Sequence, residues 1–175
     1  MAGLRGLLAA ARPAGNGADP QVGLAAARRA ARYFGPPLPP GAPLAVQLVP
    51  PPNIAVGTVP WGLAPWLPPA SVRAVSTGCS PDDLSAALDA ALRAAAGRPL
   101  IIVVRDAHRY RAARTAVGRL LAARPDAVLA EMGLPGWRPA AARSYLATYG
   151  ASASSGRAAA ELLGLAAELL GLAAG

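Results

Sequence analysis

PLIIVV, residues 99–104, is the stretch that decides the fold of this 175-residue chain. Its side chains are all apolar, and after Pro99 the five residues 100–104 are leucine, isoleucine or valine without interruption. Apolar side chains on both faces of a strand are typical of the centre of a parallel sheet, where helices cover both faces. The sequence therefore predicts a buried central strand over residues 99–104.

Predicted strands and helices alternate outward from this centre. Further strands are predicted near residues 44–49, 71–77, 126–132 and 144–150, and helices over 19–33, 80–97, 109–123 and from about 151 into the C-terminus. Asp19 and Ser80 are suited to cap their helices, and Gly97 is suited to end the second one. This alternation predicts an α/β fold, an open and mostly parallel sheet flanked by helices on both faces.

The composition is that of a globular protein, with 54% hydrophobic and 15% charged residues. The length suits one domain. All 17 basic residues are arginines, spread from Arg5 to Arg157, and the net charge is +8. Such a charge suits nucleic acid or an acidic membrane surface, but no block of basic residues concentrates it.

The single cysteine, Cys79, excludes an internal disulfide and a cysteine-rich metal site. No stretch reaches the roughly 18 uninterrupted apolar residues of a membrane span. The first residues resemble a signal peptide only faintly, because arginine returns after a short apolar run. We expect a cytoplasmic protein that does not enter membranes, with secretion left open.

Three loops follow strands of the predicted sheet at their carboxyl ends, the edge where α/β sheets usually bind ligands. They are PPNIAVGTVPWGLAPWLPP (51–69), RDAHRY (105–110) and GLPGWRP (133–139). These loops contain every tryptophan and the only histidine. The candidate residues for a substrate site or domain interface at this rim are Asn53, Trp61, Trp66, Asp106, His108, Arg109 and Trp137.

Each candidate also has a purely structural interpretation. Trp61 and Trp66 could close the core beneath a long loop, as tryptophan usually does. Asp106 could orient His108 for proton transfer, but a lone histidine is more often structural and no serine or cysteine nucleophile lies in a motif. Glu131 could be a carboxylate at the rim or could cap a neighbouring helix.

The sequence lacks GxxxxGK[ST], a GxGxxG after the first strand, HExxH, CxxC and an acidic metal loop. These motifs hold phosphates, dinucleotides and metals in the commonest α/β enzymes and metalloproteins. We therefore expect no cofactor and no metal.

Four segments in order carry a resemblance to a known family: NIAVGTVPWGL (53–63), IIVVRDAHRY (101–110), ARPDAVLAEMGLPGWRP (123–139) and YLATYGASASSGRAAAELLG (145–164). Together they resemble the C-terminal α/β domain of family 3 glycoside hydrolases, in the bacterial β-N-acetylhexosaminidase branch. The resemblance runs from about Asp19 to about Leu165. It implies residues 1–18 as an N-terminal extension, 19–165 as the α/β domain, and 166–175 as a tail.

In that family a TIM-type barrel carries the aspartate nucleophile and most sugar contacts, and the reaction is retaining. A barrel takes roughly 250 residues, and this chain also lacks the barrel's Lys-His-Phe-Pro-Gly-His-Gly type motif. No catalytic residue can therefore be carried over. The resemblance implies a non-nucleophile domain that acts on β-linked N-acetylhexosamine-type sugars only together with a barrel, as a truncated product, a split subunit or the result of a misplaced start codon.

The uncharged proline- and tryptophan-rich loop would then meet the barrel and wall one side of its sugar site. Without a barrel, that apolar surface would favour self-association. Two other functions stay open. One is a stand-alone sugar-binding or interaction module. The other, ranked last, is a nucleic-acid-binding domain that uses Arg105, Arg109, Arg111 and Arg114.

The tail repeats a heptad, since AAELLGL occurs at 159–165 and again at 166–172. Such a repeat places leucines on one stripe of a helix and suggests a seam for another chain. Two heptads are too few for a credible coiled coil, and Gly164 and Gly171 weaken the helix. A duplication that extends the last helix is the preferred interpretation.

Overall fold

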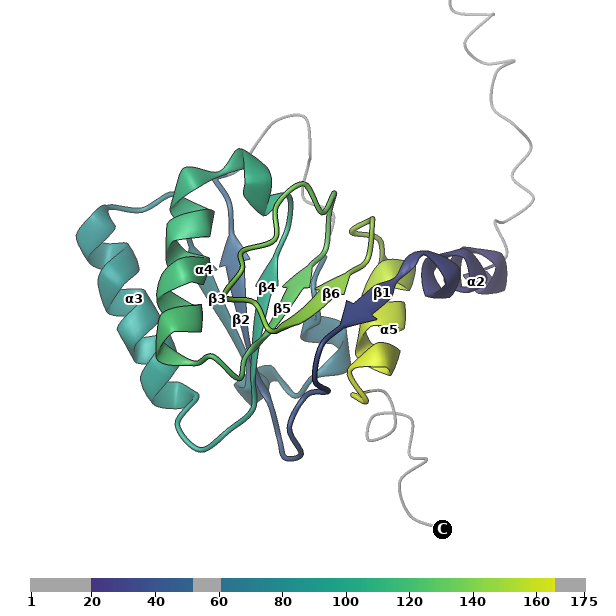
Figure 1. Cartoon of the computed structure of the whole chain (residues 1–175), viewed down its shortest axis with the longest axis horizontal. Coiled ribbons are helices and arrows are strands. Elements are labelled where there is room, and N and C mark those ends of the chain that lie inside the picture. The colour runs from purple at the N-terminus through teal and green to yellow at the C-terminus, as the bar shows by residue number, and fades with distance from the viewer. Residues whose placement is uncertain (1–19, 52–60, 166–175) are drawn as a thin grey trace, which may run out of the picture.

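The computed structural model describes residues 20–51 and 61–165, which form one sheet covered by helices (Figure 1). The sheet has six strands in the order β1-β6-β5-β4-β2-β3. Its elements in chain order are α2 (Pro20–Ala30), β1 (Arg32–Phe34), β2 (Leu44–Val49), the 3-10 turns η1 (Ala64–Trp66) and η2 (Pro69–Ser71), β3 (Val72–Ser76), α3 (Pro81–Ala94), β4 (Leu100–Val104), the 3-10 turn η3 (Ala107–Arg109), α4 (Arg111–Ala123), β5 (Val128–Glu131), β6 (Ser144–Ala147) and α5 (Ala153–Leu162).

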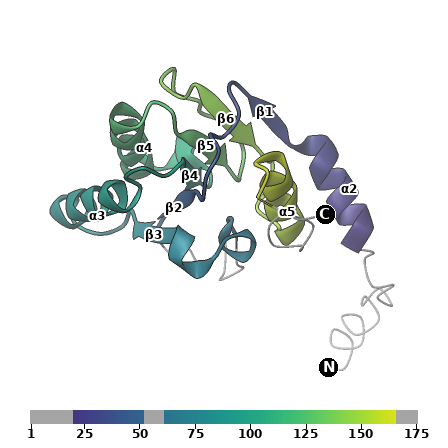
Figure 2. The same cartoon turned by 90° about the horizontal axis from the view of Figure 1, so that it is seen from below.

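The predicted α/β fold is confirmed. Strands β2 to β6 pair in parallel, and only β1 runs antiparallel, against β6. All five residues of β4 are buried, as expected for the central strand. Helices α3 and α4 cover one face, and α5 with the segment from Trp61 to Ser71 covers the other (Figure 2).

The alternation along β4 divides the core into two layers, because successive side chains of a strand point to opposite faces. Leu100, Ile102 and Val104 pack with α3 and α4. Ile101 and Val103 pack with the segment after β2 and with α5. The uninterrupted apolar run is therefore required by burial on both faces.

The first helix is shorter than predicted. It ends at Ala30 rather than near Tyr33, and Arg32–Phe34 forms the edge strand β1. The Arg32 guanidinium donates hydrogen bonds to the carbonyls of Arg29, Ala30 and Ala31, which the end of the helix leaves without partners. The residues that follow the helix pair with β6 instead. Helical periodicity cannot reveal such a non-local contact.

Local signals at α3 are confirmed. The Ser80 hydroxyl accepts a hydrogen bond from Asp83 N–H (3.2 Å) and donates one to Asp83 Oδ2 (2.7 Å). Gly97, three residues beyond the helix, has a left-handed backbone with φ of 69°. The predicted cap at Asp19 lies outside the described residues.

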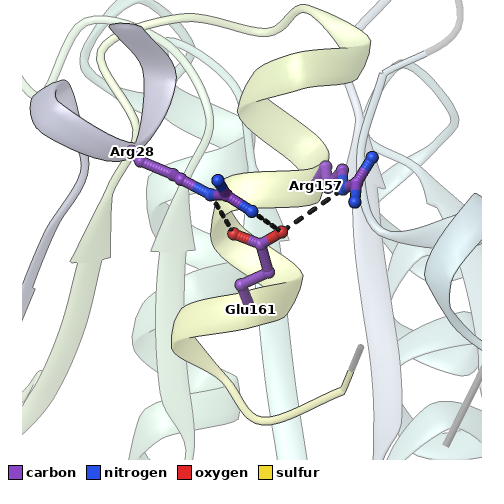
Figure 3. Close-up of polar contacts among 3 residues, drawn as sticks. All are labelled: Arg28, Arg157 and Glu161. Atoms are coloured by element: carbon purple, nitrogen blue, oxygen red, sulfur yellow. Dashed lines mark hydrogen bonds and ion pairs between the residues drawn. The ribbon is translucent and has the colours of Figure 1, made fainter. Parts of the chain in front are cut away.

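Helix α2 packs against α5 rather than against the sheet (Figure 2). Glu161 on α5 holds it through a two-bonded ion pair with Arg28, at 2.6 and 2.7 Å, and also contacts Arg157 at 3.3 Å (Figure 3). These arginines lower the pKa of the Glu161 carboxyl, chiefly through the Arg28 hydrogen bonds. None of the helices in the described ranges has the length and apolar character needed to cross a membrane.

Candidate functional site

A shallow cavity of about 490 Å³ lies at the carboxyl ends of β4, β5 and β6. We call it the rim cavity. Its side chains come from the loops after these three strands and include Arg105, Asp106, His108, Arg109, Leu134 and Tyr149. Parallel pairing brings the ends of the three strands to one edge of the sheet, and so brings the three loops together. The structure thus places the predicted Asp106, His108 and Arg109 in one site.

Two residues of the rim cavity have an unusual backbone. Asp106 and Tyr149 have φ angles of 53° and 57°, and no other non-glycine residue in the described part of the chain has a positive φ. The left-handed conformation costs a residue with a Cβ atom roughly 1–2 kcal/mol. Strain of this kind gathers at functional sites, where the surrounding structure enforces it.

The Glu131 carboxylate enforces the corner at Asp106. Its Oε1 accepts a hydrogen bond from Asp106 N–H (2.7 Å), and its Oε2 accepts one from Ala107 N–H (3.1 Å). Glu131 is only 1% exposed and ends strand β5. Of the two roles left open for this residue, the side chain takes that of a cap, at the start of the short turn η3.

Glu131 also supports the corner at Tyr149, this time through its backbone. Its carbonyl oxygen accepts a hydrogen bond from Thr148 N–H (3.1 Å), and the Thr148 hydroxyl donates to the Gly150 carbonyl oxygen (2.7 Å) on the other side of Tyr149. Thr148 precedes the strained Tyr149, so a single buried residue fixes both left-handed corners of the rim cavity.

Burial raises the pKa of Glu131 to about 7, although the N–H donors at Ala107 and Asp106 oppose the shift. The nearby negative charge of Asp106 contributes in the same direction as burial. Beneath the rim, burial and the Glu131 charge raise the pKa of Tyr145 to about 12. The site therefore contains a carboxyl group that changes its charge near neutral pH.

Two glycines allow the loops to approach closely. A Cβ atom on Gly133 would lie 2.4 Å from Asp106 Oδ1, which itself accepts a hydrogen bond from Leu134 N–H (2.9 Å). A Cβ atom on Gly136 would lie 2.9 Å from His108 Cγ. Glycine at both positions is therefore a steric requirement of the rim.

His108 lies between the rim and the backbone of Gly136. Its Nδ1 atom is buried and has no hydrogen-bond partner among the described residues. Asp106 Oδ1 accepts a hydrogen bond from Leu134 N–H, so the carboxylate bonds to the backbone rather than to the imidazole. The Asp106–His108 pair, for which proton transfer was considered against a structural role, is present in the cavity without a hydrogen bond between the two side chains in the described structure.

Trp61 and Trp66 pack against the core on one face of the sheet, and Trp137 packs against the core on the other. Trp61 lies near the rim, where the Arg105 guanidinium carbon is 5.1 Å from its ring centroid. Trp66 packs on the α5 side of the sheet and lines a second cavity, away from the rim cavity. Trp137 packs against the core on the α3 and α4 side. Asn53 lies outside the described residues. The core-closing role considered for Trp61 and Trp66 describes the packing of both, since each contacts the core on the α5 side.

The sequence alone did not single out Tyr149 and Leu134, which are exposed large apolar side chains of the rim cavity. Their exposed fractions are 51% and 64%. Leu134 follows the end of the strand predicted at 126–132, whereas Tyr149 lies within the strand predicted at 144–150, which in the structure ends earlier, at Ala147. An exposed tyrosine beside Arg109 and Asp106 offers an aromatic face and polar hydrogen-bonding groups in one place. In the described ranges, no group of three His, Cys, Asp or Glu side chains could hold a metal ion.

No protein-family model matches this chain, and no curated protein matches it either. Among solved structures, it is similar to a glycoside hydrolase family 3 beta-N-acetylglucosaminidase from Paenibacillus sp. str. FPU-7, with a TM-score of 0.57 and 16% sequence identity. The match covers 81% of this chain and 30% of that chain. At this level of identity the similarity shows a shared fold: the α/β sheet of this chain is like one part of that glycosidase.

Proposed function

We propose that this chain serves as the α/β domain of a glycoside hydrolase that acts on β-linked N-acetylhexosamine-type sugars. In this proposal a TIM-type barrel, on the same or another chain, supplies the nucleophile. The α/β domain contributes the rim cavity, which faces both the barrel and the sugar. The observation that carries the proposal is a cavity with two strained corners on a fold that matches 30% of a beta-N-acetylglucosaminidase.

The side chains of the rim cavity suit a sugar. The exposed ring of Tyr149 offers a surface on which the C–H face of a pyranose can pack. Asp106 and Arg109 supply an acceptor and several donors for hydroxyl or acetamido groups. Glu131 acts behind them as a positioning residue, because both of its carboxylate oxygens already accept backbone hydrogen bonds.

Hydrolysis of a chromogenic N-acetyl-β-glucosaminide tests the proposal, with the purified chain assayed alone and mixed with a family 3 barrel domain. We expect activity only in the mixture. Tyr149→Ser should weaken that activity, whereas Leu162→Ser should not, because Leu162 is 48% exposed on α5 and does not line the rim cavity.

Each other outcome has a clear meaning. Hydrolysis by the chain alone would overturn a non-catalytic role and would direct attention to Asp106, His108 and Glu131. Sugar binding by the chain without hydrolysis in either sample would favour a stand-alone sugar-binding module. Neither binding nor activity would remove the support for a carbohydrate function.

A further inference from the structure

The seam for another chain that the heptad repeat suggested is not an extension of the last helix. Helix α5 ends at Leu162, and Gly164 turns the backbone with a left-handed φ of 73°. Leu165 N–H donates to the Ala160 carbonyl oxygen (2.8 Å), which closes the turn. The last helix therefore does not continue into the second copy of the repeat, contrary to the sequence-based interpretation. The described residues present a different surface for another chain, at the β3 edge of the sheet.

Strand β3 lies at one end of the sheet and pairs only with β2 among the described strands (Figure 2). Thr77 N–H, just beyond the strand, donates to the Val49 carbonyl oxygen of β2 (2.8 Å). Alternate residues of a strand point their backbone groups to opposite sides, so residues 73, 75 and 77 face β2 and residues 72, 74 and 76 face outward. The outer side of β3 is therefore a strand edge to which another strand can add.

Ala74 is the centre of this edge. Val72 N–H donates to the Pro69 carbonyl oxygen, and the Ser76 carbonyl oxygen accepts a hydrogen bond from the Cys79 thiol (3.1 Å). Of the outward-facing residues, Ala74 alone has both its N–H and its C=O without a hydrogen bond in the described structure, and it is exposed. Two such groups on one residue can pair with the same residue of a second copy across a two-fold axis.

A groove separates this edge from helix α3. Its volume is about 380 Å³, and it is lined by Arg73, Ala74 and Val75 of β3 and by Ala87, Ala90 and Ala91 of α3. The Arg119 guanidinium of α4 donates hydrogen bonds to Ser85 and Asp89 on the opposite side of α3, so the alanines face away from α4, toward the end of the sheet (Figure 2). Methyl side chains leave room beside β3 for another chain.

Two opposite charges border the groove. Arg73 is exposed on β3, and Asp83 is exposed one helical turn before Ala87. Neither side chain forms an ion pair within the described ranges. The Asp83 carboxylate accepts a hydrogen bond from the Ser80 hydroxyl through one oxygen (2.7 Å). The groove therefore has a positive side and a negative side, and each of them can receive the opposite charge.

An antiparallel pairing centred on Ala74 brings these charges together. In such a pairing, Arg73 of each copy lies opposite Val75 of the other copy. Val75 is nearer the end of β3, where the chain turns through residues 77–80 into α3. The arginine of one copy is thereby moved toward Asp83 at the start of α3 in the other.

We propose that two copies of this chain associate through their β3 edges, antiparallel about a two-fold axis at Ala74, with Arg73 of each copy beside Asp83 of the other. A lone charge on an edge strand usually prevents pairing. Here the second copy supplies the opposite charge, so the contact is self-complementary. The proposal goes beyond the glycosidase function and does not depend on it, because the groove and the rim cavity share no lining residue.

Sedimentation equilibrium of the full chain tests the proposal. We expect a monomer–dimer equilibrium. Arg73→Glu and Asp83→Arg should each raise the dissociation constant of the dimer about tenfold or more, because each places like charges together. The double variant should restore the dimer, because both pairs form again with reversed sign. Arg114→Glu and Asp82→Arg make the same charge changes at exposed positions outside the groove and should leave the dissociation constant unchanged.

Three results would overturn the proposal. The first is a chain that remains monomeric at every concentration measured. The second is a dimer whose dissociation constant neither single variant changes, which would assign the contact to another surface, such as the loop of residues 51–69. The third is a dimer that both single variants weaken but the double variant does not restore, which would exclude the pairing of Arg73 with Asp83.

A second measurement depends on the backbone rather than on the charges. Directly opposite residues that exchange hydrogen bonds in an antiparallel pair have Cα atoms about 5.5 Å apart, a separation that a disulfide spans. In a Cys79→Ser background, which removes the exposed native thiol, Ala74→Cys should form covalent dimers under mild oxidation about tenfold faster than Ala122→Cys, which is exposed on α4. Equal rates for the two variants would contradict the proposal.

Discussion

The two ends of the sheet use left-handed backbone in opposite ways. At the cavity between the turn of residues 38–43 and the end of α5, the positive φ angles belong to Gly41 and Gly164, which adopt them without a Cβ penalty. At the rim cavity, Asp106 and Tyr149 adopt the same region at a cost. A position that needs only a turn can use glycine. At Asp106 the left-handed conformation is held by hydrogen bonds, since the Glu131 carboxylate accepts from Asp106 N–H and Asp106 Oδ1 accepts from Leu134 N–H.

The two ends also differ in the charge that they bury. The rim rests on Glu131, a carboxyl group that is 1% exposed. The lining of the cavity at the other end has no ionisable side chain. Stability should consequently depend on pH through the rim rather than through the other end. The following predictions test this difference, from the largest expected effect to the smallest.

The largest effect should come from the pH dependence of Glu131. Its pKa is about 7 in the fold and 4.5 ordinarily, so between these values the folded chain keeps a proton that the unfolded chain has released. Stability should therefore fall as the pH rises through this window, by up to about 3 kcal/mol. Thermal unfolding between about pH 5 and pH 8 measures it, and Glu131→Gln should flatten the curve.

Glu161→Gln is the control for this experiment. The pKa of Glu161 is lowered, so its stabilisation is present above the ordinary glutamate pKa and is lost as the pH falls. Its removal should leave the decline toward alkaline pH intact. If Glu131→Gln unfolds with the same pH dependence as the unchanged chain, the fold does not raise the pKa of Glu131.

Gly133→Ala should distort the rim, because its Cβ would lie 2.4 Å from Asp106 Oδ1 and 2.7 Å from Asp106 N. We expect a loss of about 2 kcal/mol, typical of overpacking. Gly118→Ala on helix α4 has nothing within 4 Å of the added Cβ and should instead gain about 0.5 kcal/mol from helix propensity. Urea unfolding of both variants gives the comparison. Equal stabilities would show that the rim loops rearrange freely.

The next two variants exchange glycine and non-glycine residues at left-handed positions of the two ends. Tyr149→Gly should stabilise the chain by up to about 1 kcal/mol through relief of the left-handed strain, while it removes the exposed ring. Gly164→Ala should destabilise it by about 1 kcal/mol for the inverse reason. Denaturant midpoints measure both. A loss of stability in Tyr149→Gly would mean that packing of the tyrosine ring, rather than function, explains its presence.

The smallest effect concerns the helix pair outside the comparison of the two ends. Glu161→Gln should loosen α2, because it removes the charge that binds Arg28 across the helices. Amide hydrogen exchange over Pro20–Ala30 should become faster at neutral pH, with little change in the β4 strand. Arg157→Gln, which removes the Glu161 contact within α5, should leave α2 protected. Unchanged exchange in the first variant would assign the docking of α2 to its apolar contacts alone.

Much of the fold could be predicted from short segments of the sequence. The run at residues 99–104, the Ser80 cap and the alternation of strands with helices each depend on residues that are close in sequence. The three-residue β1 escaped prediction, because it exists only by pairing with β6, far along the chain. The candidate site divides in the same way. Asp106, His108 and Arg109 lie on one loop, and the position of that loop after the central strand predicted that they lie at the rim of the sheet.

The sequence by itself determined the class of fold, the identity of the central strand and the loops that follow the strands, because local apolar periodicity and turn residues specify these features. Only the tertiary structure decided that Trp66 and Trp137 pack on opposite faces while Tyr149 joins Asp106. It alone decided that Glu131 fixes both corners of the rim. The physical reason is that these contacts depend on the order of strands in the sheet and on the close approach of separate loops, which no local pattern of residues records.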